Sequence, residues 1–297
     1  MMKEIKHFLI HLRLHYQFVL LSGGFLLGGF MSPEMNTQQY WLQFLNVHVL
    51  LFGGATAYNS WWDKDTGPIG GLKKPPVMTQ WMHRVSMMMM FSGLIWACFI
   101  SGVYALVYAI SLTLFWLYST PHARWKGRPV LSLFAIGIST GFNSVLLGTI
   151  SAGGPINQTI LLVALGASLI LLSMYPVSQI FQQNEDLRRK DVTFTIAYGV
   201  KGMRIFFLIN FTLGLILLSA GLYSVSQIPA MVLFVGCCVS GTFLAKIVFT
   251  LRGDTNEYGK VMKSKTIASL SFVIFFLVAN VLKHGWLGQT FFNEYFK

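Results

Sequence analysis

The sequence NQTILLVALGASLILLSMYPVSQIFQQNED, residues 157–186, decides the fold of this chain. Residues 157–181 contain no charged side chain, and about 20 apolar residues are enough for an α-helix to cross a lipid bilayer. The segment ends in a polar cluster that includes Gln182, Glu185 and Asp186. Carboxylates at the end of a membrane-buried helix are costly to place, so we expect this cluster to serve a function.

Similar apolar stretches recur along the whole chain. A mean hydropathy of +0.60, with 54% hydrophobic and 11% charged residues, excludes an ordinary soluble domain. The stretches lack the alternating polar residues of a membrane barrel. We therefore predict an all-α integral membrane protein with about nine spans, forming one domain over residues 1–297. The predicted spans cover residues 14–31, 40–60, 84–102, 104–118, 130–150, 157–181, 203–223, 228–250 and 266–283.

The chain has a net charge of +12, but the positions of its basic residues argue against nucleic acid as a partner. Lys and Arg gather in alternate loops, whereas the loops around 32–39, 151–156 and 224–227 contain neither. By the positive-inside rule, this alternation predicts a cytoplasmic N-terminus, an external C-terminus and a cytoplasmic position for the polar cluster after residue 181. We expect the protein to lie in a bacterial cytoplasmic membrane; no residue pattern indicates an oligomeric state.

A second polar cluster, Asn59-Ser60-Trp61-Trp62-Asp63-Lys64-Asp65, follows the apolar stretch 40–60. Asn59 and Asp63 are four residues apart and share one face of a helix, and Gln182 and Asp186 repeat this spacing. Carboxylate and amide oxygens are the ligands that suit Mg²⁺ when it bridges to a phosphate. Two such clusters on one side of the membrane favour a metal–diphosphate site over solvated helix ends.

The loop GPIGGLKKPP, residues 67–76, is rich in residues that form turns. Its glycines permit a close approach of the backbone to a phosphate, and Lys73 and Lys74 lie near its end. Two interpretations remain open at this stage. The lysines contact the phosphates, or they only fix the orientation of the loop in the cytoplasm.

In this order of features the chain resembles the UbiA superfamily of intramembrane prenyltransferases. That family has nine helices, an Asn-Asp-x-x-Asp-x-x-x-Asp motif after helix two and an Asp-x-x-x-Asp motif after helix six. Asn59 and Asp63 match the first motif, and Asp186 matches the end of the second. Residues 191–199, DVTFTIAYG, resemble the Thr-containing run that leads into helix seven, and residues 118–129, YSTPHARWKGRP, are similar to the basic loop between helices four and five.

The chain also departs from the family pattern at three positions. Ser60 and Gly67 stand where the first motif has Asp, and Gln182 replaces the leading Asp of the second. Three consequences are open: Asp65 and Glu185 take over as ligands, metal binding is weaker, or activity is lost. We interpret the pattern as a divergent subgroup with its own Asn-Ser-x-x-Asp-x-Asp motif.

The resemblance implies a bundle with cytoplasmic cap loops that uses Mg²⁺ to transfer a polyprenyl group from an isoprenyl diphosphate to a lipophilic acceptor within the membrane. The acceptor expected from the family is an aromatic quinone precursor. The implied catalytic residues are Asn59, Asp63 and Asp186. The implied metal ligands are Asn59, Asp63, Asp65, Gln182, Glu185 and Asp186, and the implied phosphate contacts are Lys73, Lys74, Arg124 and Lys126.

Two other classes of protein are weighed against this enzyme. A family member that binds isoprenoid diphosphate without turning it over is suggested by Ser60 and Gly67. A transporter would place ionisable groups near the middle of the bilayer. Here the acidic residues cluster at one predicted membrane face, which favours the enzyme.

Overall fold

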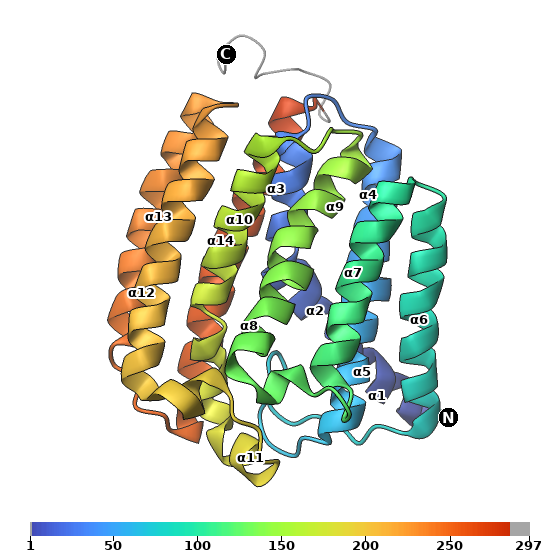
Figure 1. The fold of residues 1–297 in the computed structure, drawn as a ribbon, viewed down its shortest axis with the longest axis vertical. Helices are drawn as coiled ribbons and strands as arrows, with labels where there is room; N and C mark the ends of the chain where they lie inside the picture. Colours follow the sequence, from blue (N-terminus) through green and yellow to red (C-terminus); the bar gives the residue numbers. More distant parts are fainter. Residues whose placement is uncertain (1, 286–297) are drawn as a thin grey trace.

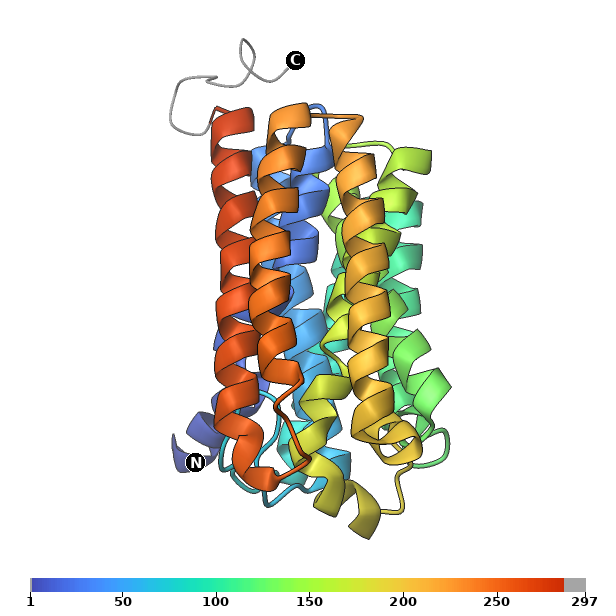
Figure 2. The ribbon, with the colours of Figure 1, turned by 90° about the vertical axis from the view of Figure 1, so that its left-hand side faces the viewer.

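The computed structural model describes residues 2–285, and those residues form helices joined by short loops. Figures 1 and 2 show that most helices run along the long axis of the molecule, with the N-terminal segment at the lower end. The all-α architecture predicted from the sequence is confirmed. The last twelve positions, 286–297, where we predicted an external C-terminus, lie outside the described residues.

The first half of the chain forms several interrupted helices. Its elements are α1 (Met2–Leu12), α2 (Leu14–Tyr16), η1 (Gln17–Leu21), α3 (Gly23–Met31), α4 (Thr37–Leu45), η2 (Asn46–Gly53), α5 (Gly54–Asp63), α6 (Gln80–Cys98), α7 (Gly102–Ser119), η3 (Trp125–Gly127), α8 (Pro129–Ile136), η4 (Gly137–Phe142) and α9 (Asn143–Ala152).

The second half contains longer helices, of which α12 is kinked at Gly199. Its elements are α10 (Gln158–Ser173), η5 (Pro176–Gln182), α11 (Gln183–Arg188), α12 (Phe194–Tyr223), α13 (Gln227–Val248), η6 (Thr255–Glu257) and α14 (Tyr258–Lys283). The predicted span 157–181 is not one continuous α-helix, because Pro176 follows the end of α10 and begins the 3₁₀ turn η5. A proline inside a helix removes a hydrogen bond and clashes with the preceding turn, which explains the break.

Within residues 2–285, six helices are long and apolar enough to cross a membrane, and a seventh span results if a bent pair is counted as one. That pair joins Met2–Leu21 to Gly23–Met31 at an angle of 47°. The helices over 37–63 and 80–98 do not meet the same test. The integral membrane character is supported, and the count of nine spans stays a prediction.

Three π-helical stretches, η1, η2 and η4, interrupt the helices of the first half. Each lies inside a predicted span, in a stretch whose residues do not predict irregular winding. Short π-helical stretches inside α-helices are frequent at functional sites. Leu21, Phe52 and Thr140, one from each stretch, line the same internal cavity.

Glycine contacts hold the helices at close range in two places. A Cβ on Gly148 of α9 would lie 2.1 Å from the carbonyl oxygen of Phe25 in α3. A Cβ on Gly166 of α10 would lie 2.5 Å from the backbone nitrogen of Leu218 in α12. Small residues of this kind let helix backbones approach each other, which is how membrane helices commonly pack.

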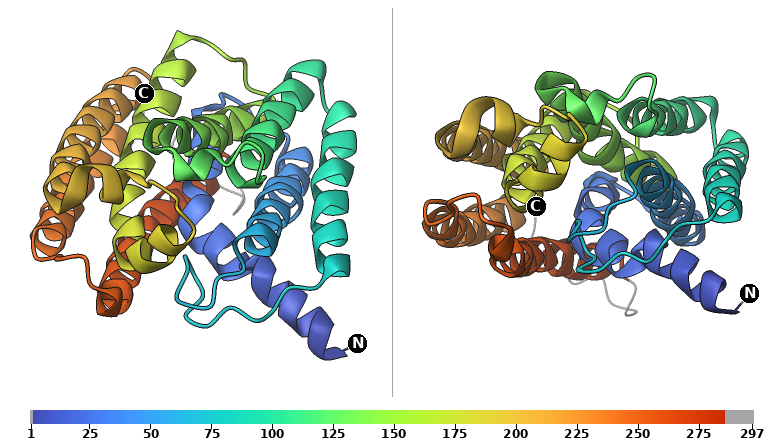
Figure 3. Two further views of the ribbon diagram at one scale, coloured as in Figure 1. Left: turned by 60° about the horizontal axis from the view of Figure 1, so that its bottom comes forward. Right: turned by 90° about the horizontal axis from the view of Figure 1, so that it is seen from below.

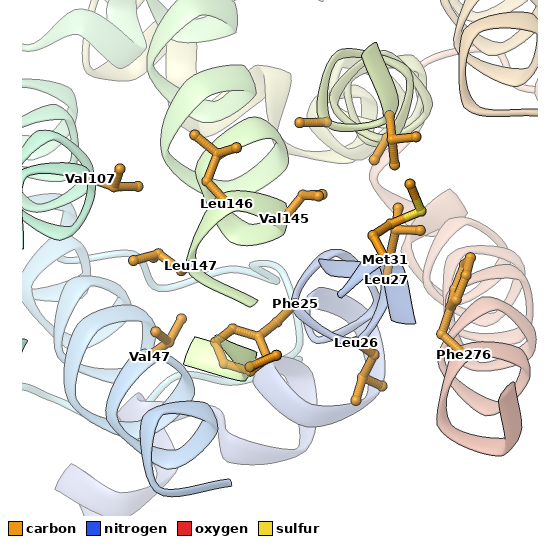
Figure 4. Packing of buried hydrophobic residues seen from close by; sticks show 14 of the residues in the cluster. Phe25, Leu26, Leu27, Met31, Val47, Val107, Val145, Leu146, Leu147 and Phe276 are labelled. Atoms are coloured by element: carbon orange, nitrogen blue, oxygen red, sulfur yellow. The ribbon is translucent and has the colours of Figure 1, made fainter. Parts of the chain in front are cut away.

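The buried apolar core surrounds α3 and α9 (Figure 4). Phe25 and Leu27 of α3 and Val145 and Leu147 of α9 are completely buried. Val107 of α7 and Phe276 of α14 pack into the same cluster from other sides. The packing of this core holds in place the helices that carry the polar clusters.

Both polar clusters lie at the same end of the bundle. Figure 3 views that end and shows α11, the loop after α5 and the loop between α7 and α8 gathered there, beside the N-terminal helix. The loops at 32–36, 153–157 and 224–226 are at the opposite end in Figure 1. The predicted alternation of loops is therefore present, and its assignment to the two sides of a membrane stays a prediction.

Candidate active site

The first polar cluster closes α5. The Asn59 amide nitrogen donates to Asp63 Oδ2 at 2.8 Å, so the two residues share a helix face as their spacing predicted. Ser119 at the end of α7 donates to Asn59 Oδ1 at 3.0 Å and fixes the amide. Lys126 donates to Asp63 Oδ1, and both side chains are nearly buried.

The second polar cluster meets the first through Arg189. This guanidinium pairs with Asp186 Oδ1 at 2.7 Å and with Asp65 Oδ1. One cation therefore bridges a carboxylate from each cluster. The two clusters come together in the structure, as predicted. Their carboxylates Asp65 and Asp186 both contact the Arg189 guanidinium.

Arg124, a predicted phosphate contact, has a different partner. It forms a double hydrogen bond with Asp191, with Nε to Oδ1 at 2.6 Å and Nη2 to Oδ2 at 2.8 Å. Asp191 itself borders the cavity, whereas Arg124 does not, although its Nη2 lies 4.0 Å from Asp63 Oδ1. Such a fork-shaped pair gives both strength and fixed geometry, so Arg124 holds Asp191 in position.

Gln182 and Glu185, both predicted as metal ligands, contact the loop 67–76. Gln182 Nε2 donates to the carbonyl oxygen of Pro68 at 3.2 Å, and Glu185 Oε1 accepts from the backbone nitrogen of Gly67 at 2.7 Å. A Cβ on Gly67 would lie 2.7 Å from that same Oε1. The Glu185 carboxylate therefore occupies the space into which a side chain at position 67 would extend.

Lys73 and Lys74 are exposed and do not border the cavity. The structure brings Asn59, Asp63, Asp65, Lys126 and Asp186 together around the cavity, and Gln182 joins them at its edge. Lys73 and Lys74 are not among the residues at the cavity. Their assignment as phosphate contacts stays a prediction, which this geometry does not support.

The cavity has a volume of about 980 Å³ and joins two environments. At one end it is bordered by the polar residues of both clusters. Further along it is bordered by apolar side chains of many helices, including Phe115, Ile170, Leu233 and Phe272. A ligand with a charged head and a long apolar tail fits this division.

The charges around Asp63 and Asp65 set different ionisation states. Burial would raise the pKa of Asp63, but Lys126 and Arg189 hold that pKa below its ordinary value. Burial and the negative charge of Asp63 raise the pKa of Asp65 to about 6, in spite of Arg189. Asp63 is therefore the firmly ionised member of the pair.

The side chains around the cavity offer only a few ligands for a Mg²⁺ ion. Among residues 2–285 no group of three or more His, Cys, Asp or Glu side chains is placed to hold a metal on its own. Mg²⁺ is usually bound through one or two carboxylates, with substrate phosphates and water completing its shell. Asp63 and Asp186 supply hard oxygens from two sides of the cavity, and the buried Oε1 of Gln179, which also borders it, has no hydrogen-bond partner. These residues fit a phosphate-bound ion better than a metal cage made by the protein alone.

Sequence reasoning missed four polar residues of this site. Ser119 and Asp191 contact residues that are distant in the sequence, so no spacing along the chain reveals their contacts. Arg189 lies three residues after Asp186 on one helix face, a spacing that could have identified it. Arg13 precedes the first predicted span, where the sequence shows it only as one of the basic residues that indicate topology, yet it is buried and borders the cavity.

The model of the UbiA prenyltransferase family matches residues 19–283. The chain belongs to the UbiA prenyltransferase family. The resemblance inferred from Asn59, Asp63 and Asp186 is confirmed at the level of the family, and the chain is an enzyme of the prenyltransferase class. None of the curated proteins matches the chain.

Solved structures show the same fold. The UbiA homologue from Archaeoglobus fulgidus bound to DMAPP and Mg²⁺ has a TM-score of 0.73 at 14% identity, over 93% of this chain and 99% of that one. The same homologue bound to GPP and Mg²⁺ has a TM-score of 0.73 at 14% identity, over 92% and 99%. A structure of digeranylgeranylglyceryl phosphate synthase has a TM-score of 0.66 at 18% identity, over 94% and 99%.

Proposed function

We propose that this UbiA-family protein is a Mg²⁺-dependent enzyme that transfers a polyprenyl group from an isoprenyl diphosphate to a lipophilic acceptor, an aromatic quinone precursor. The observation that carries the proposal is the single cavity bordered by both polar clusters and continuing among apolar helices. The relatives bound to DMAPP or GPP with Mg²⁺ support the same donor class.

Asp63 and Asp186 would hold the metal, with Asp65 as a further ligand. The Asn59 amide orients the Asp63 carboxylate through the hydrogen bond between them. When bound, Mg²⁺ neutralises the negative charge that develops on the departing diphosphate. Lys126 and Arg189 already lie against the carboxylates, so phosphate oxygens entering between them would meet two positive side chains.

The apolar part of the cavity would hold the prenyl tail. Its border follows α13 from Val232 to Leu244, a rise of about 18 Å at ~1.5 Å per residue. That length suits a chain of several isoprene units rather than a single one. Charged residues border one end of the cavity. We place this end, which would hold the diphosphate head, at the cytoplasmic face of a bacterial membrane, and we propose that residues 1–297 form one domain.

The test uses purified protein in nanodiscs, geranylgeranyl diphosphate as donor and a panel of phenolic acceptors, with and without Mg²⁺. Asp63→Asn and Asp186→Asn should each lower product formation at least ~100-fold, since each removes a carboxylate that stabilises transition-state charge through the metal. Glu34→Gln is the matched control, because Glu34 is an exposed carboxylate at the other end of the bundle. Full activity of both aspartate variants, or product without Mg²⁺, would contradict the proposal.

A further inference from the structure

The first helix, α1, carries an exposed apolar stripe. Met2 is 85% exposed, Ile5 45% and Leu9 53%. These residues are three or four positions apart, so their side chains share one face of the helix. Phe8 and Leu12, on the neighbouring face, are buried against α5 and α6. One face of α1 is therefore docked on the bundle, while the next presents apolar side chains outward.

The position and charge of α1 indicate what covers this stripe. Figures 2 and 3 show the N-terminal end of α1 projecting outward from the end of the bundle that carries the polar clusters. Lys3 and Lys6 are exposed beside the stripe, whereas Glu4, the one acidic residue of α1, is half-buried. An apolar stripe flanked by lysines is typical of a helix that lies in the surface of an anionic membrane.

The end of α1 and the residues that follow it are tied to the loop 67–76. Each of three side chains donates a hydrogen bond to a backbone carbonyl oxygen of the loop: His11 Nε2 to Pro76 at 2.8 Å, Arg13 Nη1 to Gly70 at 2.8 Å and His15 Nε2 to Gly71 at 3.1 Å. Arg13 has a left-handed backbone, with φ of 48°. That conformation is unfavourable for a residue other than glycine and persists only where surrounding contacts hold it. A displacement of α1 would therefore break contacts of the loop.

The loop 67–76 covers the polar end of the cavity. Ile69 is buried and, with Gly70, borders the cavity. Within the loop, Ile69 and Leu72 exchange two backbone hydrogen bonds, at 2.8 and 3.0 Å. Gln182 and Glu185 contact the loop at Pro68 and Gly67. The loop is thus a folded cover that depends on the first helical segment as well as on the second polar cluster.

We propose that α1 is a membrane-surface helix whose docking on anionic phospholipid holds the loop 67–76 over the cavity. Its apolar stripe inserts among the lipids, and Lys3 and Lys6 contact the headgroups. A bilayer surface matches both features at once, since apolar chains and anionic headgroups meet where a membrane-spanning bundle ends. The inference goes beyond prenyl transfer, because it concerns control of the cover by the membrane and requires no substrate.

The test is hydrogen exchange of the protein in two kinds of nanodisc, without substrate or Mg²⁺. One contains phosphatidylcholine alone, and the other contains equal parts of phosphatidylcholine and phosphatidylglycerol. The readout is exchange of the Ile69 and Leu72 amides, whose hydrogen bonds break when the loop unfolds locally. In the wild-type protein, this exchange should be about threefold or more slower in the anionic bilayer, because its surface potential attracts both lysines.

Variants of α1 separate its charge from its apolar stripe. Lys3→Gln and Lys6→Gln, combined in one protein, should remove the difference between the two bilayers. Leu9→Gln puts a polar side chain into the stripe and should speed exchange of the loop in both bilayers. These side chains are exposed, so the variants should keep the unfolding temperature of the wild-type protein.

Lys263→Gln is the matched control, since Lys263 is an exposed lysine near the start of α14, at the same end of the bundle. It should keep the full effect of anionic lipid. His15→Ala tests the link to the loop, because it leaves the stripe and both lysines in place and removes the hydrogen bond to Gly71. Exchange of Leu72 should then rise about threefold or more in both bilayers.

Three results would overturn the inference. One is equal exchange of the loop amides in the two bilayers by the wild-type protein. Another is a lipid effect that survives in the double lysine variant, or that Lys263→Gln removes equally, which would assign it to surface charge in general. The third is protection of the loop that requires two copies of the protein in one nanodisc, which would assign the stripe to a second copy of the chain.

Discussion

At the scale of single residues, the site is a set of carboxylates held against basic side chains. Asp63 lies against Lys126, while Arg189 contacts both Asp65 and Asp186. Each pairing offsets part of the free-energy cost of burying a carboxylate. The carboxylates are thereby positioned for a ligand that combines metal cations with phosphate groups. The three departures from the family pattern, at Ser60, Gly67 and Gln182, each have a structural partner: Arg13, Glu185 and Pro68.

The raised pKa of Asp65, about 6, predicts a pH dependence of metal–donor binding. An acid with a raised pKa is neutral below that value, so Asp65 becomes a better ligand as the pH rises from 5 to 7. Mg²⁺-dependent binding of donor should tighten over this range. Because the terminal phosphate of the donor also loses a proton near pH 6, the decisive quantity is the difference between the wild-type protein and Asp65→Asn. A variant with the same pH profile as the wild-type protein would refute the role of Asp65.

Glu185 is predicted to anchor the loop 67–76 through its contact with the Gly67 backbone. Glu185→Gln keeps an oxygen that can accept this hydrogen bond, whereas Glu185→Ala removes it. Trypsin cleavage at Lys73, which is exposed in this loop, should rise about tenfold or more in the alanine variant and little in the glutamine variant. Equal cleavage in the two variants would mean that Glu185 does not hold the loop.

At the scale of elements, the glycine contact between α3 and α9 sets the distance between the two central helices. Gly148→Ala would place a methyl group 2.1 Å from the Phe25 carbonyl oxygen, so the helices must separate. Overpacking of this kind costs about 1–3 kcal/mol, and the thermal unfolding temperature should fall. Gly102→Ala at the start of α7 has open space around it and serves as the control, with no fall expected.

The sequence predicted the helical segments well because apolar length is a property of each segment alone. It placed α13 and α14 within a few residues at their C-terminal ends, and the span predicted over 157–181 corresponds to the candidate span Gln158–Arg188. The change from α-helical to 3₁₀ winding at Pro176 was not predicted. The π-helical stretches η1, η2 and η4 were not predictable, since neighbouring helices determine them.

The candidate site was likewise predictable only where its contacts are local in the sequence. The spacing of Asn59 and Asp63 predicted a shared helix face, which the hydrogen bond between them confirms. Arg13 and Asp191 could not be found in this way, because their partners lie 47 and 67 residues away along the chain. Contacts over such separations depend on the fold and leave no local pattern.

At the scale of the whole molecule, we expect the size of the cavity to determine which donor can be used. Gly236 of α13 borders its apolar part and has no neighbouring atom within 4 Å of an added Cβ. Gly236→Phe should therefore fill the cavity without disturbing the packing and shift the preferred donor toward shorter prenyl chains. Relative kcat/KM values for geranyl, farnesyl and geranylgeranyl diphosphate measure the shift.

Val235→Phe provides the matched control for this prediction. Val235 is adjacent on α13, is 62% exposed and does not border the cavity. Its substitution should leave the chain-length preference unchanged. The same shift in both variants would show that bulk on α13 acts through the surrounding lipid or the helix position, and not through the cavity.

The contacts of α14 with the beginning of the chain have a consequence for biosynthesis. Asn280 donates to the Leu26 carbonyl oxygen at 2.8 Å, and Lys265 reaches Tyr16 from the same helix. Because α14 is translated after the other described helices, the wall that it shares with the segment around Tyr16 is missing from any nascent chain that stops before residue 258. The growing polypeptide is thus exposed to lipid along this seam until α14 has been made, and substrate can be enclosed only after these two distant segments have met.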